Sequence, residues 1–199
     1  MTNATGSHLE RLQQITDAAL AHLQLDALLA ELLMRIRDIL GADTAAVLLL
    51  DDDERDLVAW AAVGLEEEVE RGIRIPLGHG FAGRVAAQRR PIVLDDVDHA
   101  DVLNPVLREK GVKSLLGVPL VIEGRVLGVL HIGTLAPRPF TKDDVELLQL
   151  AADRVSIAID HARLFEAERR ARVRLEHVQA VTDTALMYLE LDDLLWELL

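Results

Sequence analysis

Histidines are the side chains of this sequence with the greatest capacity for proton transfer or metal binding. Seven are present, and no two lie four residues apart, the spacing with which a helix presents two imidazoles to one metal ion. His131 falls within a predicted central strand, where it either faces a cavity or is a core histidine with a backbone hydrogen bond. His161 is followed by Ala162 rather than by an acidic residue, so its context does not indicate a phosphoacceptor.

Carboxylates gather in two loops. The run from Asp51 to Asp56 joins two apolar segments, but an EF-hand calcium loop needs glycine at its sixth position and glutamate at its twelfth, where Asp56 and Ala62 stand. This run is therefore predicted to be a solvated hairpin turn. Asp95 and Asp96 begin the second acidic loop, and we expect them to cap or solvate it.

Nucleophilic and thiol chemistry have little support. The chain has no cysteine, which excludes disulfides, thiolate catalysis, iron–sulfur clusters and cysteine-ligated zinc. None of Ser7, Ser114 and Ser156 lies in a Gly-x-Ser-x-Gly sequence. We therefore predict that the domain is not an enzyme and has no catalytic residue and no metal site.

The charge balance narrows the class of partner. The 199 residues include 21 Lys and Arg against 34 Asp and Glu, a formal net charge of −13. Such acidity disfavours nucleic acid and anionic membranes as partners. No run of apolar residues is long enough to cross a membrane, and residues 1–8 do not resemble a secretory signal. The expected location is cytoplasmic, with no membrane insertion.

The hydrophobic pattern predicts helices at both ends of a group of strands. Two helices in series are expected over residues 9–40, with Asp26 as the N-cap of the second. Two hairpins are expected at 45–63 and 114–134. The intervening chain is predicted to form strands at 73–77 and 91–94 and short helices at 66–71, 81–89 and 105–110. A last helix starts at Thr141, in a capping box with Asp144, and continues at least to Leu189.

The last helix has two apolar stripes. One suits packing against a sheet. The other suits a partner helix, because its members recur every seven residues: Leu150, Ile157, Leu164, Ala171, Val178 and Ala185.

The two ends of the chain repeat each other. Residues 9–33 and 175–199 are identical at 15 of 25 positions without a gap. We interpret this as a duplicated unit of connector helix and domain, with the chain a fragment that stops as the second domain begins. A C-terminal dimerisation helix is the alternative.

Three ordered motifs resemble those of GAF domains, over about residues 26–165. They are GHGFAGRVA at 78–86 with RPIVLDDV at 90–97, SLLGVPL at 114–120 with GRVLGVL at 124–130, and PFT at 139–141 followed by Asp143, Asp144, Leu147 and Leu148. The glycines of the first motif suit either a packing turn or an anion site at a helix N-terminus. The packing turn is favoured, because the sequence is not that of a phosphate loop.

The order of the expected elements indicates an antiparallel sheet with helices on one face. The resemblance implies an α+β, PAS-related fold, an antiparallel sheet flanked by helices, with long N- and C-terminal signalling helices. The expected divisions are a connector helix at 1–25, the GAF domain at 26–165, and at 166–199 a connector with the truncated start of a second GAF repeat.

Known ligands of the family can be compared with the sequence. Members that bind cyclic nucleotides carry Asn-Lys ahead of a phenylalanine and Asp-Glu four residues after it. Here Phe140 and Asp144 match, Val145 replaces the glutamate, and Asn-Lys is absent. Bilin-binding members need cysteine, and haem-binding members carry a histidine where residues 109–113 have none. We expect no cofactor of these three kinds, and the identity of any small-molecule ligand stays open.

By resemblance the chain is a sensor that binds a small molecule, or dimerises, and signals through its C-terminal helix to an output module in cis. That module would be a histidine kinase of a two-component system, a phosphatase or a cyclase. The alternative is a ligand-free structural dimerisation module. A homodimer through helices 9–40 and 143–199 is expected in both cases. The candidate ligand-binding residues are Trp60, Phe81, His99, Leu103, Leu107 and His131.

Overall fold

A computed structural model describes residues 25–197 of the chain. Most of the predicted N-terminal connector, and the last two residues of the repeat, lie outside this range. The chain separates into two compact units divided between Asp160 and His161. The first contains the sheet and its helices, and the second is the continuation of the last helix.

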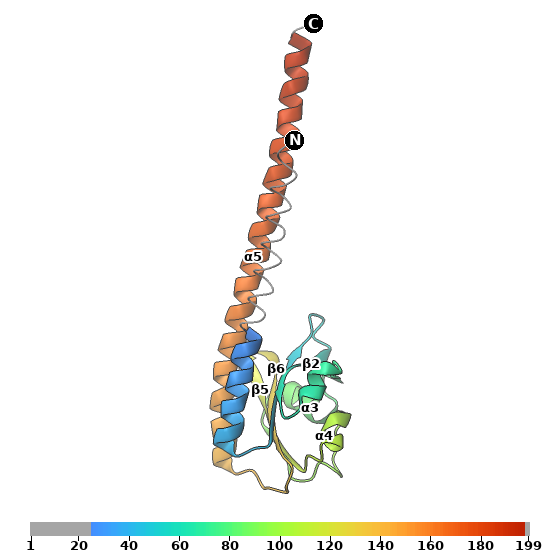
Figure 1. The fold of residues 1–199 in the computed structure, drawn as a ribbon, viewed down its shortest axis with the longest axis vertical. Coiled ribbons are helices and arrows are strands. Elements are labelled where there is room, and N and C mark those ends of the chain that lie inside the picture. The colour runs from blue at the N-terminus through green and yellow to red at the C-terminus, as the bar shows by residue number, and fades with distance from the viewer. Residues whose placement is uncertain (1–24, 198–199) are drawn as a thin grey trace. The chain divides into compact units, whose positions relative to one another are not determined.

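Six antiparallel strands form one sheet in the order β3-β2-β1-β6-β5-β4 (Figure 1). The two predicted hairpins supply its centre, as β1 (Thr44–Leu50) with β2 (Asp56–Val63) and β5 (Ser114–Ile122) with β6 (Arg125–Thr134). The two short edge strands are β3 (Arg74–Pro76) and β4 (Ile92–Leu94). The central pairing of β1 with β6 joins hairpins that are distant in the sequence.

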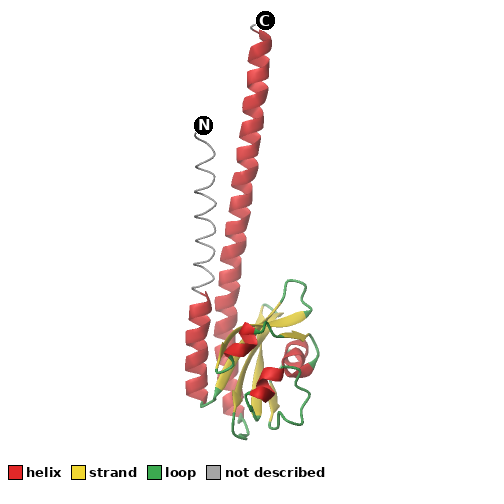
Figure 2. Cartoon of the chain, turned by 45° about the vertical axis from the view of Figure 1, so that its right-hand side comes forward, coloured by secondary structure: helices red, strands yellow, loops and turns green. Residues whose placement is uncertain are grey.

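Helices cover both faces of the sheet (Figures 1 and 2). On one face lie residues 25–40, which are helical, and the first part of α5 (Lys142–Glu197). On the other face lie three shorter helices: α2 (Glu66–Glu70), α3 (Gly80–Gln88) and α4 (Pro105–Glu109). We call these sides the long-helix face and the cover face. The expectation of helices on one face only was wrong, because the central strands are apolar on both sides and both sides must be buried.

The long-helix face is an apolar seam. Leu29, Leu33, Leu148 and Ile159 are each fully buried there. Full burial of one such side chain stabilises a fold by roughly 1.5–3 kcal/mol. The pattern of apolar residues therefore explains why the helix of residues 25–40 and the first part of α5 lie against this side of the sheet.

Glycines allow the helices of the cover face to approach the sheet closely. A Cβ on Gly117 of β5 would lie 2.7 Å from the ring of Phe81 in α3, so only glycine lets that ring lie over the strand. A Cβ on Gly83 would lie 2.2 Å from the carbonyl oxygen of Pro76. The glycine motif at 78–83 is thus a packing turn, as the sequence favoured.

The start of α5 is fixed by its predicted capping box. The backbone N–H of Asp144 donates to Thr141 Oγ1 at 3.2 Å, and the N–H of Thr141 donates to Asp144 Oδ2 at 2.8 Å. Arg138 adds a second connection, because it donates to the carbonyl of Leu40 at 2.6 Å and to Asp144 Oδ1 at 2.9 Å. One guanidinium thus joins the end of the first long helix to the beginning of the second.

Asp26 does not have the predicted capping role, because it lies within the helix of residues 25–40. The prediction that α5 runs unbroken to Leu189 is confirmed, since the helix continues to Glu197. None of the described helices is both long and apolar enough to span a bilayer.

Candidate functional site

A small cavity lies between the sheet and the cover. Its walls come from β1, β3, β6, α3, α4 and the loop before α4, and they consist of Leu48, Ile75, Phe81, Ala82, Val102, Leu103, Asn104, Leu107 and His131. Its free volume is ≈ 10 Å³, about the space of one water molecule. The walls are mostly apolar, so the two polar side chains among them decide what the cavity can bind.

A buried polar cluster adjoins this cavity and consists of Glu68, Asn104 and His131. Glu68 lies in α2 and is 0% exposed. Its Oε1 accepts a hydrogen bond of 2.6 Å from Asn104 Nδ2, and its Oε2 lies 3.7 Å from His131 Nε2. Asn104 is also the N-cap of α4, where its Oδ1 accepts from the N–H of Val106 at 3.0 Å. The cluster therefore joins α2, α4 and the central strand β6.

Two atoms of the cluster have no hydrogen-bond partner: Glu68 Oε2 and His131 Nδ1. Leaving a buried polar atom unsatisfied costs roughly 1–3 kcal/mol, and more when the group is charged. His131 lines the cavity and Glu68 lies next to it, so an incompletely bonded imidazole beside a buried carboxylate is available to form a hydrogen bond with a molecule in the cavity. This is the arrangement in the fold that is best suited to binding.

Ion pairs at the surface connect two helices of the cover face. Lys110 Nζ lies 2.6 Å from Glu67 Oε1, and Arg71 Nη1 lies 2.7 Å from Glu109 Oε2, so two pairs connect α2 with α4. The hydrogen bond from Lys110 lowers the pKa of Glu67, and the same bond raises the pKa of Lys110. Both pairs are solvent-exposed and thus weak enough to open without unfolding the sheet.

The structure brings together four of the six predicted site residues. Phe81, Leu103, Leu107 and His131 all line the cavity. The rings of Phe81 and His131 meet edge to face with centroids 6.2 Å apart. Whether they bind a ligand stays a prediction.

Trp60 is not among the residues that line the cavity, which corrects its predicted position. A bulge in β2 is the reason: Ala59 lies opposite Leu48 and Ala61 opposite Val47, so the register steps over Trp60. Its indole N–H instead donates to Asp26 of the first long helix at 3.0 Å. Strict strand alternation, on which the prediction rested, does not hold across a bulge.

His99 also lies away from the cavity, on the exposed loop before α4. Its Nδ1 donates to Asp96 Oδ2 at 2.8 Å, and this hydrogen bond lowers the pKa of Asp96. Asp96 further accepts from the backbone N–H of Asp98, so the expectation that it caps the acidic loop is confirmed.

Two residues of the cluster, Glu68 and Asn104, were not predicted from the sequence. Glu68 stands in the run Glu66–Glu70, where nothing in the residue types separates the buried glutamate from its exposed neighbours. Asn104 had a usable signal, because Asn followed by Pro and an apolar residue is typical of a helix start.

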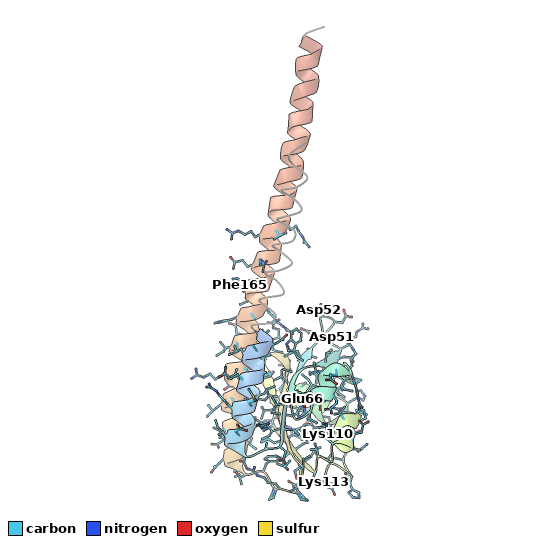
Figure 3. All side chains as sticks on the ribbon, in the orientation of Figure 1. Asp51, Asp52, Glu66, Lys110, Lys113 and Phe165 are labelled. Atoms are coloured by element: carbon cyan, nitrogen blue, oxygen red, sulfur yellow. The ribbon has the colours of Figure 1, made fainter. Side chains whose placement is uncertain are left out.

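Hydrogen bonds and an ion pair stabilise the acidic turn between β1 and β2, at which Figure 3 labels Asp51 and Asp52. Asp51 accepts from the backbone N–H groups of Asp56 and Arg55, which lower its pKa, and it forms an ion pair with Arg74. Within residues 25–197, no three His, Asp or Glu side chains lie close enough together to hold a metal ion.

Comparisons with known proteins agree with this architecture. A family model described as "GAF domain" matches residues 22–160. The fold is similar to the GAF domain of a phosphoenolpyruvate-protein phosphotransferase from Coxiella burnetii, with a TM-score of 0.65 and 26% identity over 78% of this chain and 96% of that one. It is also similar to the second GAF domain of DevS from Mycobacterium smegmatis, with a TM-score of 0.56 and 26% identity over 75% and 99% of the two chains. The predicted fold class is thus confirmed.

Two curated relatives are regulatory or signalling proteins. The chain is 26% identical over 168 residues to the probable 3',5'-cyclic phosphodiesterase pde-5 of Caenorhabditis elegans, an alignment that covers 76% of this chain and 23% of that protein. It is 25% identical over 168 residues to the formate hydrogenlyase transcriptional activator of Salmonella typhimurium, covering 81% of this chain and 24% of that protein. The chain therefore spans about a quarter of the length of these relatives.

Proposed function

Because this chain belongs to the GAF domain family, which occurs in signalling proteins, we propose that it is a regulatory sensor that binds a small molecule in the cavity of the cover face. The observation that carries the proposal is the buried cluster of Glu68, Asn104 and His131, with two unpartnered polar atoms beside a water-sized space. A purely structural core of this size would be more stable with apolar residues in these positions.

A chain of contacts supports a signalling route from the cover to the long helices. Ser114 is fully buried, and its Oγ donates to the carbonyl of Asp95, where the loop over the cavity begins. The same Oγ accepts from the backbone N–H of Arg138 at 3.0 Å. Arg138 in turn joins Leu40 to Asp144. Movement of the loop would therefore reach the point where both long helices are anchored.

The output module would follow α5 in the same polypeptide. Alignments to about a quarter of each relative's length leave room for other domains, and a kinase, phosphatase or cyclase remains our proposal for this part. The sensor itself would be a cytoplasmic domain without enzymatic activity, bound neither to membrane nor to nucleic acid.

The binding proposal is tested by filling the cavity. Ala82→Val adds two methyl groups to a side chain on its wall, whereas Ala86→Val adds the same groups to a buried position of the same helix that does not line it. Overpacking costs both variants roughly 1–3 kcal/mol of unfolding free energy. We expect only Ala82→Val to abolish saturable thermal stabilisation by compounds that stabilise the wild-type chain. Equal binding by all three proteins would refute the site.

The proposed signalling route is tested separately by Ser114→Ala. Ligand binding to the wild type should slow hydrogen exchange of the amides at 40–42 and 138–145. Ser114→Ala should keep the binding and lose this distant protection. Retained protection in the variant would place the route elsewhere.

Dimerisation is a second proposed function, and a specific surface favours it. On the long-helix face, the large side chains Ile39, Leu150 and Ile157 are 70%, 64% and 46% exposed. An apolar groove of ≈ 350 Å³ runs between the two long helices and is lined by Ile36, Ile39, Leu40, Leu147, Leu150, Ala151 and Arg154. We propose that the same face of a second copy covers this groove.

Light scattering tests the dimer. The chain has a mass of 22.0 kDa, so a particle of twice this mass is expected at micromolar concentration. Leu150→Glu should shift it to monomer, whereas Leu135→Glu, at a 48% exposed leucine in the loop after β6, should not. A monomeric wild type would refute the dimer. A dimer that survives deletion of residues 175–199 would show that the first unit is sufficient for it.

A further inference from the structure

The cavity has a definite charge preference. Among the described residues that line it, none is a lysine or an arginine. The fully buried Glu68 does not itself line the cavity, but it is next to Asn104 and His131, which do. When ionised, a carboxylate whose one hydrogen-bond donor is a neutral amide attracts a cation in a low-dielectric interior and repels an anion. An anionic ligand is therefore the least suited to this site.

The unpartnered atoms of the cluster show which hydrogen-bonding groups are missing. Glu68 Oε2, when ionised, can only accept a hydrogen bond. His131 turns Nε2 toward that oxygen, at 3.7 Å, which favours the tautomer with its hydrogen on Nε2. Nδ1 is then an acceptor as well. Both unpartnered atoms consequently need a donor.

The size of the cavity limits the ligand further. A free volume of ≈ 10 Å³ holds a water molecule or an ammonium ion without rearrangement. A short alkyl group can be added by displacing Leu103, which lines the cavity yet is 48% exposed. The ring of Phe81 adds apolar surface to the wall, against which such an alkyl group would pack.

The geometry points to a small N–H-donating cation, ammonium or a short primary alkylammonium, as the ligand of this site. The inference rests on the proposed sensor function and names the chemical class that the sensor detects. The ammonium group would lie against His131 and Asn104, which line the cavity, and donate to the unpartnered His131 Nδ1. The Glu68 carboxylate, which is next to both residues, would balance its charge.

The first test compares two cations of equal charge on the 199-residue chain. Methylammonium chloride has three N–H donors, and tetramethylammonium chloride has none. At pH 7 and constant ionic strength, ammonium and methylammonium should raise the melting temperature saturably and give a calorimetric binding isotherm. Sodium and tetramethylammonium should do neither. Equal effects of methylammonium and tetramethylammonium would overturn the inference.

The second test changes the protein. Glu68→Gln keeps the shape of the side chain and removes its charge, and we expect methylammonium to bind about tenfold or more weakly. Glu70→Gln, the same change at an exposed position of the same helix, should leave the affinity unchanged. Unaltered binding by a folded Glu68→Gln variant would overturn the inference. If this variant does not fold, the comparison of cations on the wild-type chain decides.

Other probes separate this inference from the sensor proposal. Formate and urea are offered at the same concentrations as methylammonium. Saturable binding of either one in preference to methylammonium overturns the cation class and leaves the sensor proposal standing. If no probe binds, the cation inference fails, and the sensor proposal is judged by native mass spectrometry of the purified chain for a co-purified small molecule.

Discussion

The two faces of one sheet are completed in different ways. On the long-helix face, large apolar side chains close the core, and the buried hydroxyl of Ser156 is bonded to the carbonyl of Ala152. On the cover face, a fully buried glutamate and a histidine remain incompletely bonded around a small cavity. The helices of the long-helix face still expose apolar side chains to solvent. The cover face instead contains buried polar atoms that have no hydrogen-bond partner.

This difference shows how one domain can serve two kinds of partner. Exposed apolar surface is relieved by another protein surface, since burial of area is its driving force. Buried polar atoms are relieved by a small molecule that brings a matching group. The long helices and the short cover helices thus divide the two proposed roles between opposite sides of the sheet.

The largest effect on the unfolding free energy is expected from removing a buried side chain on the long-helix face. Leu148→Ala removes a fully buried side chain, and we expect it to lower the unfolding free energy by about 2–5 kcal/mol, because it leaves a cavity. Leu135→Ala, at a 48% exposed leucine in the loop after β6 that does not line the groove, should cost less than about 1 kcal/mol. Urea denaturation measures both. Similar losses in the two variants would contradict the proposed importance of the seam.

On the cover face, Glu68→Gln tests whether the buried carboxylate lowers the stability of the chain. Neutralising an incompletely bonded buried carboxylate should raise the unfolding free energy of the ligand-free chain by about 1–3 kcal/mol. Glu70→Gln should change it by less than about 0.5 kcal/mol. Urea denaturation again gives the difference. A marked destabilisation by Glu68→Gln would mean that the carboxylate serves the structure rather than binding.

The junction of the long helices should respond to pH. Burial raises the pKa of Asp144, but the hydrogen bonds from Thr141 and the charge of Arg138 outweigh it, so the folded-state pKa lies below the usual 3.8. The stabilisation is therefore present above pH 3.8 and is lost as the pH falls through the folded-state value. Asp144→Asn should cost about 0.5–2 kcal/mol near pH 7.

This pH dependence has a control in the adjacent residue. Asp143→Asn removes the same charge from an exposed position of the first turn. Thermal unfolding of Asp144→Asn and wild type should converge in strong acid, whereas Asp143→Asn should stay close to wild type throughout. A constant difference between Asp144→Asn and wild type at every pH would contradict a role for the ionised carboxylate.

The smallest effect on stability is expected for the ion pairs that connect α2 with α4. Lys110→Gln removes the ion pair with Glu67 and should lower the melting temperature only slightly, because solvent screens the pair. The cost should decrease in high salt, which screens such pairs. Lys142→Gln, at an exposed lysine on the first turn of α5, is the control. Melting temperatures in low and high salt measure the difference. A decrease in melting temperature that does not depend on salt would argue against a contribution from the ion pair.

The sequence alone determined the elements and their class. Alternation and turn residues placed both hairpins, glycine spacing placed the turn before α3, and Thr141 with Asp144 placed the start of α5. These features are local, since each depends on residues that are close together in the chain. Two of the four residues that line the cavity could also be predicted locally, because Phe81 follows the glycine turn and His131 lies in a predicted central strand.

Only the tertiary structure decided which polar groups lost contact with water. Glu68 is buried and Glu70 exposed, although both stand in one short run of glutamates, because the helix turns one of them toward Asn104 and His131. The bulge that turns Trp60 toward Asp26 likewise depends on how β2 pairs with β1. Burial and register arise from contacts between segments distant in the sequence, so the pattern of residue types predicts the elements but not the chemistry of the cavity.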